Sequence, residues 1–269
     1  MTAPVLECQD LKVSFLKKNR LIKAVDGVNI HIDPGECFGL VGGSGCGKST
    51  LARLITRLKD SDSGKILVEN EDVTRVKGKD LKSFYRKVQM VFQDPVGSFD
   101  PRKTIGKSIL EVLGNFGLAK KADRKELVTE ALEMVGLSAE HALRLPGQIS
   151  GGQCQRAALA KAVVVRPKLL ICDEVTSALD VSVQAQIIDL LSELQKNLNM
   201  ALLFISHDLS LVRCFTTRLG VMHDGRIVET GPADEVVANP QHEHTKLLLS
   251  SLFPIPKRSC EFEPISPAA

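Results

Sequence analysis

Short apolar runs recur along the chain, and several are separated by stretches with helical spacing. Five runs have the length of buried strands, at residues 37–41, 88–92, 169–172, 201–205 and 219–222. Apolar residues recur at helical intervals in 183–198 and 209–216. Strands that alternate with helices in this way form parallel sheets with crossover connections. The pattern therefore predicts an α/β fold.

Two further regions predict structure outside this alternation. Residues 5–15 mix polar and β-prone side chains and residues 28–32 alternate, which predicts two strands of a half-exposed sheet. A short strand is expected at 65–68, after a turn signal. Residues 104–144 carry helical spacing, so the middle of the chain is predicted to be helical.

The composition narrows the class of protein. With 269 residues, 43% of them hydrophobic, the chain is long enough for one large domain or a core with an inserted subdomain. The net charge of +3, with interspersed charges, argues against a nucleic-acid partner. Seven cysteines without CxxC spacing disfavour disulfides and zinc and fit a reducing cytoplasm. No run approaches the roughly 20 apolar residues that cross a bilayer, so membrane association is expected through a protein partner.

A glycine-rich loop follows the first apolar run. Residues 42–49 read GGSGCGKS, which matches GxxxxGK[ST] between a predicted strand and a helix that begins at Lys48. Glycines let backbone N–H groups approach phosphates closely, and the helix N-terminus adds positive charge. We expect Lys48 to reach the β- and γ-phosphates, Ser49 to bind Mg²⁺ and Thr50 to bond on the α-phosphate side. The predicted nucleotide-binding residues here are Gly42, Gly43, Ser44, Gly45, Cys46, Gly47, Lys48, Ser49 and Thr50.

Two carboxylates follow the apolar run at 169–172. Asp173 suits the coordination shell of a magnesium ion. Glu174 would polarise, or accept a proton from, the water that attacks the γ-phosphate. Two acidic residues after an apolar run are often merely solvated. The presence of the phosphate loop in the same chain favours these functional roles for Asp173 and Glu174.

The segment Ser150, Gly151, Gly152 and Gln153 lies between these two motifs and resembles the signature sequence of ABC ATPases. The resemblance covers roughly residues 5–255. It implies that a helix begins after the segment, with N–H groups that bind the γ-phosphate held by an opposite subunit. The alternative is an N-capping serine followed by two flexible glycines.

Further marks of the family follow in the expected order. Gln93 resembles the glutamine that reaches the metal and the attacking water, and His207 resembles the histidine that bonds the γ-phosphate. Asp180 ends a segment similar to the loop that crosses the dimer interface. Phe15 stands where the family stacks an aromatic ring on adenine, with Val25 as its packing neighbour; a core role is the alternative. The implied catalytic residues are Glu174, His207 and Gln93, and the implied metal ligands are Ser49, Gln93 and Asp173.

The resemblance also implies an architecture and a mechanism. The expected fold is α/β, a P-loop NTPase (RecA-like) core with an antiparallel β subdomain and an inserted α-helical subdomain. The ATPase domain would cover residues 1–255, with the helical signature subdomain at about 95–165 and a C-terminal tail at 256–269. Two such domains would close head to tail over two ATP molecules. A permease helix would dock near residues 95–102.

Three segments resemble more specifically the bacterial importers of peptides and nickel. They read FQDPVGSFDPR at 92–102, FISHDLSLV at 204–212 and NPQHEHTK at 239–246. These systems combine two different ATPases, two permeases and an extracytoplasmic binding protein, and the chain resembles the second ATPase of the pair. The resemblance implies a peripheral protein at the cytoplasmic face of the inner membrane that uses ATP and Mg²⁺. Peptides are the expected cargo; nickel, metal chelators, opines and a non-transport ABC role are alternatives.

Overall fold

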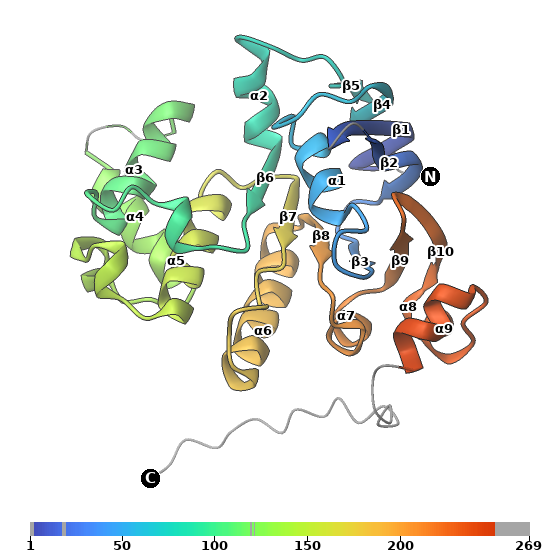
Figure 1. Cartoon of the computed structure of the whole chain (residues 1–269). Coiled ribbons are helices and arrows are strands. Elements are labelled where there is room, and N and C mark those ends of the chain that lie inside the picture. Colours follow the sequence, from blue (N-terminus) through green and yellow to red (C-terminus); the bar gives the residue numbers. More distant parts are fainter. Residues whose placement is uncertain (1–2, 18–19, 119, 121, 251–269) are drawn as a thin grey trace.

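A central sheet of six strands organises the protein, in a computed structural model that describes residues 3–17, 20–118, 120 and 122–250 (Figure 1). Its strands are β3 (Cys37–Val41), β6 (Val88–Val91), β7 (Leu169–Asp173), β8 (Ala201–Ile205), β9 (Arg218–His223) and β10 (Arg226–Pro232). Their order is β10-β9-β3-β8-β7-β6. All neighbours pair in parallel except β10, which is antiparallel to β9.

The strands at the middle of this sheet are apolar because both of their faces are covered. Every residue of β3, β7 and β8 is buried, as expected for parallel strands between two layers. The register pairs Val91 with Cys172 and Asp173 with Ile205, so the carboxyl ends of β6, β7 and β8 meet at one edge. The α/β prediction is confirmed.

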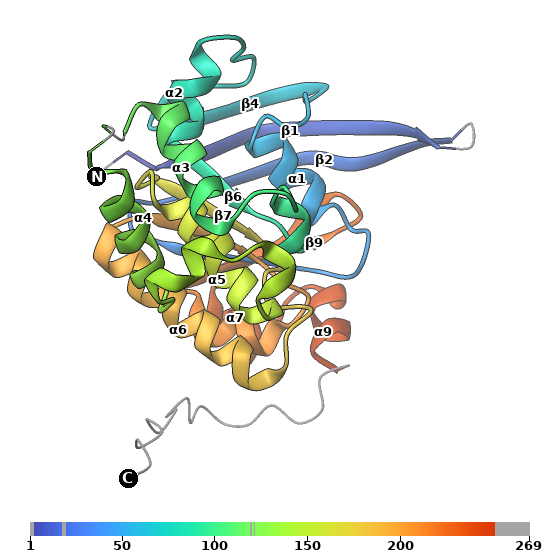
Figure 2. The same cartoon turned by 90° about the vertical axis from the view of Figure 1, so that its left-hand side faces the viewer.

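Four antiparallel strands form a second sheet on one face of the first. They are β1 (Leu6–Lys17), β2 (Arg20–Ile32), β4 (Ser63–Val68) and β5 (Glu71–Asp72), in the order β2-β1-β4-β5. With helix α1 (Lys48–Ile55) they share a core with the central sheet that includes Leu40, Leu51 and Ile205. Figure 2 shows β1 and β2 as a long hairpin extending past the body of the protein. The predicted strand 28–32 is therefore too short, because the first half of β2 is exposed and lacks alternation.

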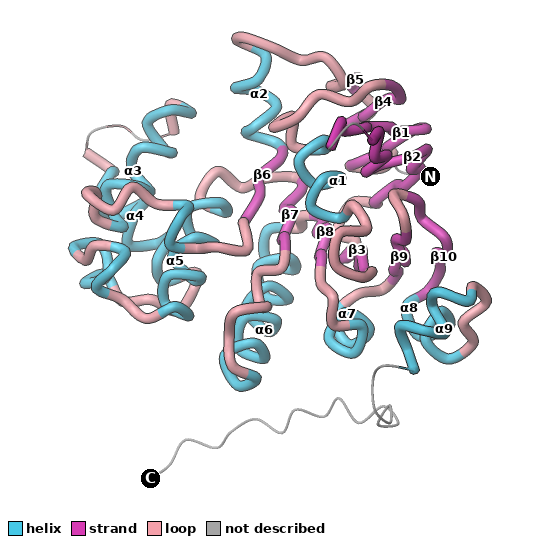
Figure 3. The backbone as a smooth tube through the Cα atoms, in the orientation of Figure 1, coloured by secondary structure: helices cyan, strands magenta, loops and turns pink. Residues whose placement is uncertain are grey.

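Helices cover the opposite face of the central sheet. α5 (Gly151–Val163), α6 (Val181–Leu198) and α7 (Leu209–Phe215) pack there in a second core with Leu170 and Phe204. α3 (Ile105–Phe116) and α4 (Arg124–Glu133) pack on α5, in the lobe at the left of Figure 3. The middle of the chain is helical, as its spacing predicts. The boundaries at 1–255 and 95–165 stay predictions, and the predicted tail 256–269 lies outside the described residues.

Several short elements were not predicted from the sequence. They are α2 (Asp80–Lys87), α8 (Ala233–Ala238), α9 (Glu243–Ser250) and two 3₁₀ turns, η1 (Val96–Ser98) and η3 (Pro146–Gln148), whereas the turn η2 (Ala139–Leu143) lies inside the region predicted to be helical. Each is too short for its apolar spacing to stand out. Within the described ranges, none of the helices combines the length and the apolar character needed to span a membrane.

Candidate functional site

The predicted functional side chains follow the carboxyl ends of neighbouring parallel strands. Lys48 lies at the start of the helix that follows β3, and the loops after β6, β7 and β8 carry Gln93, Glu174 and His207 respectively. The strand register places these loops along one edge of the sheet. Open parallel sheets bind their ligands outside the carboxyl ends of the strands. This edge is therefore the candidate site.

The phosphate loop requires glycine where its backbone passes other strands. Gly42 has a φ of +157°, and a Cβ there would lie 2.2 Å from the carbonyl oxygen of Met222. Gly47 has a φ of +116°, and its Cβ would lie 2.2 Å from the carbonyl oxygen of Ala24. A side chain fits neither the backbone conformation nor the space. The two glycines thus hold the loop against β9 and β2.

The loop surrounds a buried amine. Lys48, the first residue of α1, is 4% exposed, and its Nζ donates to the carbonyl oxygens of Gly42 (2.8 Å) and Gly43 (3.1 Å). The Cys46 thiol lies 3.8 Å from the same amine, whereas Ser44 and Gly45 are exposed on the outside of the loop. A lysine amine at a helix N-terminus and a glycine-rich backbone together form an anion-binding site.

A hydroxyl and a carboxylate lie side by side next to the amine. Ser49 donates from Oγ to Oδ1 of Asp173 at 3.0 Å. Burial raises the pKa of Asp173 above its usual range, against the opposing effect of the Ser49 hydrogen bond. Hydroxyl and carboxylate oxygens are the hard ligands that Mg²⁺ prefers. The two residues therefore fit a magnesium ion, and their role as metal ligands stays a prediction.

The backbone of Glu174 is held in an unusual conformation. Its φ is +50°, its N–H donates to the carbonyl oxygen of Ile205 (3.0 Å), and its own carbonyl accepts from the Ser177 hydroxyl (2.9 Å). Such backbone strain in a non-glycine residue concentrates at functional sites. The carboxylate lies 3.8 Å from Nδ1 of His207, whose side chain is 58% exposed. The structure thus brings Glu174 and His207 together.

Gln93 has a partner that the sequence did not indicate. Its Nε2 donates to the Ser177 hydroxyl at 3.2 Å rather than to Ser49 or Asp173. Ser177 also bonds the carbonyl oxygen of Glu174. Gln93 therefore reaches the Glu174 turn through Ser177, and its role as a metal ligand stays a prediction.

The predicted signature segment begins α5. Gln153 donates its N–H to Oγ of Ser150 (3.2 Å), and Ser150 donates its N–H to Oε1 of Gln153 (3.0 Å). This reciprocal pair is a capping box, so the N-capping alternative is confirmed as a structural role. Gly151 is exposed, and Gly152 lies against Val183 of α6. α5 and α1 belong to cores on opposite faces of the sheet, so the segment and the phosphate loop begin helices that pack on different faces of the sheet.

Asp180 is also a helix cap. Its Oδ1 accepts from the N–H of Val183 (3.0 Å) and from the Ser182 hydroxyl (2.7 Å). The Ser182 hydrogen bond lowers the pKa of Asp180 below its usual range. The carboxylate is exposed, so it is placed at the surface beside the start of α6.

Phe15 and Val25 occupy different environments. Phe15 is 37% exposed, pairs with Ile22 across the hairpin and lies 4.2 Å from the Lys59 amine. Val25 is 1% exposed and pairs with Val13, so it packs in the core. The ring of Phe15 is partly exposed with the Lys59 amine over it, and its role at adenine stays a prediction.

Comparison with known proteins assigns the family. A model of the family described as ABC transporter matches residues 25–177, which include the phosphate loop and both carboxylates. The chain belongs to the ABC transporter family. This ABC ATPase is 48% identical over 258 residues to the oligopeptide transport ATP-binding protein OppF of Bacillus subtilis (strain 168), covering 95% of the chain and 84% of that protein. It is 44% identical over 258 residues to the dipeptide transport ATP-binding protein DppF of Lactococcus lactis subsp. cremoris (strain MG1363), covering 94% and 83%.

A solved structure supports the same family at the level of the fold. It is a dimeric ATP-binding cassette in a post-hydrolysis state bound to ADP and phosphate. It is 27% identical to the ABC ATPase described here, with a TM-score of 0.77, and covers 85% of this chain and 98% of its own. The P-loop ATPase fold, ATP binding and ATP hydrolysis thus belong to this chain as a member of the family.

Sequence reasoning missed parts of this site. Ser177 begins the segment at 177–180 that resembles the loop at the dimer interface, but no sequence pattern indicates its contact with Gln93. The backbones of Ala24 and Met222 lie close to the phosphate loop. Because every residue type has the same backbone, no sequence pattern indicates these contacts. Only the folded chain reveals contacts of this kind.

Proposed function

We propose that this ABC ATPase is one of two different ATPase subunits that power a bacterial peptide importer at the cytoplasmic face of the inner membrane. The observation that carries the proposal is the 48% identity to an oligopeptide transport ATP-binding protein over 95% of this chain. The chain also has the side chains expected for ATP hydrolysis at its sheet edge. Two permeases and an extracytoplasmic binding protein complete the complex.

The side chains at the sheet edge have separate tasks in hydrolysis. The Lys48 amine neutralises the β- and γ-phosphates. The Glu174 carboxylate orients the attacking water and accepts its proton, and His207 bonds the γ-phosphate. A Mg²⁺ ion held by Ser49 and Asp173 would stabilise the charge on the phosphates.

A second ATPase subunit completes each site. The N-terminus of α5, with Ser150 to Gln153, is a positive helix end suited to a γ-phosphate. It packs on the opposite face of the sheet from α1, which supports an arrangement in which this segment meets a phosphate bound by Lys48 of another subunit. The dimeric cassette among the structural neighbours supports such an arrangement. Asp180 then lies at the interface between the subunits.

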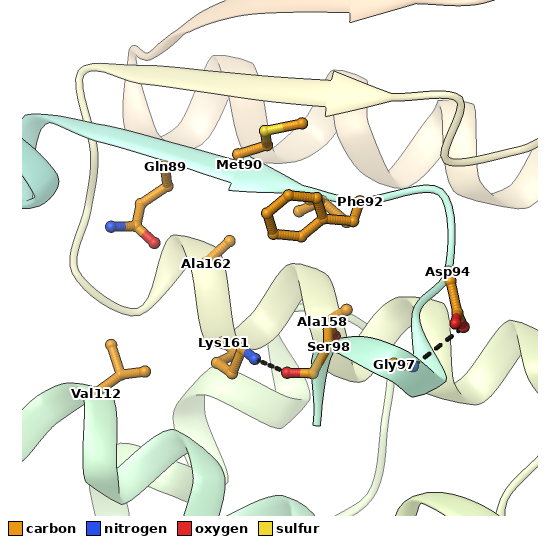
Figure 4. A pocket seen from close by; sticks show the side chains of 11 residues that line it. Gln89, Met90, Phe92, Asp94, Gly97, Ser98, Val112, Ala158, Lys161 and Ala162 are labelled. Atoms are coloured by element: carbon orange, nitrogen blue, oxygen red, sulfur yellow. Dashed lines mark hydrogen bonds between the residues drawn. The ribbon is translucent and has the colours of Figure 1, made fainter. Parts of the chain in front are cut away.

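A groove beside the site suits a permease helix. It has a volume of 590 Å³ and opens between β6, α5 and η1 (Figure 4). Met90, Phe92, Val112 and Ala158 contribute apolar surface to it. Amphipathic helices dock in apolar grooves of this kind. The groove adjoins the residues 95–102 that the sequence assigns to permease docking.

Uptake into proteoliposomes tests the proposal. The complex of this chain with the second ATPase and the permeases is reconstituted with ATP on the side of the ATPases, and the binding protein is added on the other side. We expect uptake of a labelled oligopeptide and none of radioactive ⁶³Ni²⁺. Uptake of nickel alone would replace peptide by nickel as the cargo, and failure to assemble with any permease would contradict the importer assignment.

A further inference from the structure

Lys161 is a half-buried cation that lines the groove proposed to bind a permease helix. It projects from α5, and in the part of the chain that the structure describes its amine forms no ion pair with a carboxylate. Burial lowers the pKa of the Lys161 amine below its usual range. A lysine is a costly residue at such a position, where a leucine or methionine would pack without loss of hydration. The side chain therefore needs an explanation beyond packing.

The amine joins α5 to the segment that follows Gln93. Lys161 donates from Nζ to the carbonyl oxygen of Ser98 at 2.5 Å (Figure 4). The same amine lies 4.6 Å from the centre of the Phe99 ring, which is 6% exposed. A cation over a ring and a charge-assisted hydrogen bond add to each other. Both interactions end on one short segment, residues 94–99, which we call the groove wall.

The groove wall is held together by hydrogen bonds between its own residues. Asp94 accepts the N–H of Gly97 at 3.0 Å, and the Ser98 hydroxyl donates to the carbonyl oxygen of Pro95 at 2.7 Å. A Cβ on Gly97 would lie 2.5 Å from Oδ2 of Asp94, so the turn is closely packed. The groove wall begins directly after Gln93, which is predicted to reach the attacking water.

The other end of α5 carries the signature segment. Lys161 is eleven residues after Ser150, which places the two ends of this helix roughly 16 Å apart at 1.5 Å per residue. The capping box of Ser150 and Gln153 fixes the signature segment to the start of α5. The Lys161 contacts fix the groove wall near the end of the same helix. A helix of this length transmits a displacement without bending, because its backbone hydrogen bonds are internal.

We propose that Lys161 is a positioning residue that fastens the groove wall to α5, so that a permease helix entering the groove moves the signature segment together with the wall. The inference rests on the proposed function, since it requires a permease in the groove. It assigns to one side chain the link between docking and the position of Ser150 to Gln153. Without this link the groove still binds the permease helix, but α5 no longer moves with the groove wall.

Three variants and one control test the link in the reconstituted complex. Lys161→Met keeps the length of the side chain and removes the charge and the donor, and Lys161→Arg keeps both. Phe99→Leu keeps apolar packing and removes the ring. Lys125→Met, on the exposed surface of α4, removes a cation of no assigned role and serves as the control. The readout is the coupling ratio, the ATPase rate with peptide-loaded binding protein divided by the rate with empty binding protein.

We expect Lys161→Met to lower the coupling ratio about fivefold and Phe99→Leu to lower it less, because single residues on a coupling route change it by this order. Lys161→Arg and Lys125→Met keep the wild-type ratio. Thermal unfolding of each variant separates this effect from loss of the fold, since a purely structural role lowers the melting temperature without changing the ratio. An unchanged ratio in both Lys161→Met and Phe99→Leu would overturn the inference.

Hydrogen exchange in the assembled complex reports on the link itself. In the wild type, permease docking should slow amide exchange both at residues 94–99 and at residues 151–154. In Lys161→Met only the groove wall should remain protected. Equal protection of both segments in that variant refutes the inference alone. A wild-type complex that peptide-loaded binding protein does not stimulate refutes the proposed function, and the inference with it.

Discussion

Replacing Glu174 by glutamine should stop hydrolysis and leave the protein folded. The backbone of Glu174 is fixed by bonds to Ile205 and Ser177 that involve only main-chain atoms of residue 174. Glutamine keeps those bonds and nearly the same side-chain shape. The contact with His207 adds less than about 1 kcal/mol to the free energy of unfolding, because exposed ion pairs contribute little and His207 is 58% exposed.

The loss in rate follows from the chemistry of the amide. Glutamine can orient a water molecule but cannot accept its proton. A general base contributes about 10²- to 10⁴-fold. At about 1.36 kcal/mol for each factor of ten, the variant loses about 3–5 kcal/mol of transition-state stabilisation. Lys48 and Ser49 are unchanged, so ATP binding should persist.

Phosphate release by the purified complex measures this loss. Binding of a fluorescent ATP analogue and the melting temperature are measured on the same samples. Glu193→Gln, an exposed carboxylate on α6, is the matched control and should keep the wild-type rate. A Glu174→Gln rate within about threefold of wild type would refute the assignment of this residue as the base.

Three further changes test the loop, the helix cap and the buried carboxyl. Gly47→Ala should weaken ATP binding by more than about tenfold, because the backbone has a positive φ and the new Cβ would lie 2.2 Å from a carbonyl oxygen, which displaces the loop. Titration of the variant with ATP measures the affinity. Gly114→Ala is the control, because a Cβ there meets nothing within 4 Å. Ser150→Ala should lower the free energy of unfolding by about 1 kcal/mol, seen as a melting temperature roughly 2–4 °C lower; an unchanged melting temperature contradicts the cap. Asp173→Asn should abolish hydrolysis yet raise the melting temperature at pH 7, since ionisation of a buried carboxyl with a raised pKa destabilises the fold as pH rises above the unfolded pKa. That gain should vanish below about pH 4, and a gain independent of pH would contradict it.

The nucleotide site was the most predictable part of the protein because its chemistry depends on contiguous residues. Lys48 and Ser49 follow from the spacing of one loop, and Asp173 follows from its place at the end of a buried strand. These residues share local sequence with the strand and helix that position them. Their placement in the structure matches the expectation.

Contacts between distant loops were not predictable. Gln93 and Ser177 are 84 residues apart, and their hydrogen bond depends on the pairing of β6 with β7. The capping box of Ser150 was expected only as an alternative to phosphate binding, yet a cap satisfies only some of the N–H groups in the first turn of a helix. The early start of β2 was missed because exposed strands lack the alternation that burial imposes.

Hydrolysis that responds to cargo is the central claim, and one measurement tests it most directly. The ATPase rate of the complex in proteoliposomes is recorded with binding protein that is empty, loaded with an oligopeptide or exposed to Ni²⁺. The account predicts that the peptide-loaded form alone raises the rate and that Glu174→Gln removes the response. A chain that hydrolyses ATP at the same rate in all three conditions, and without any permease, would contradict it.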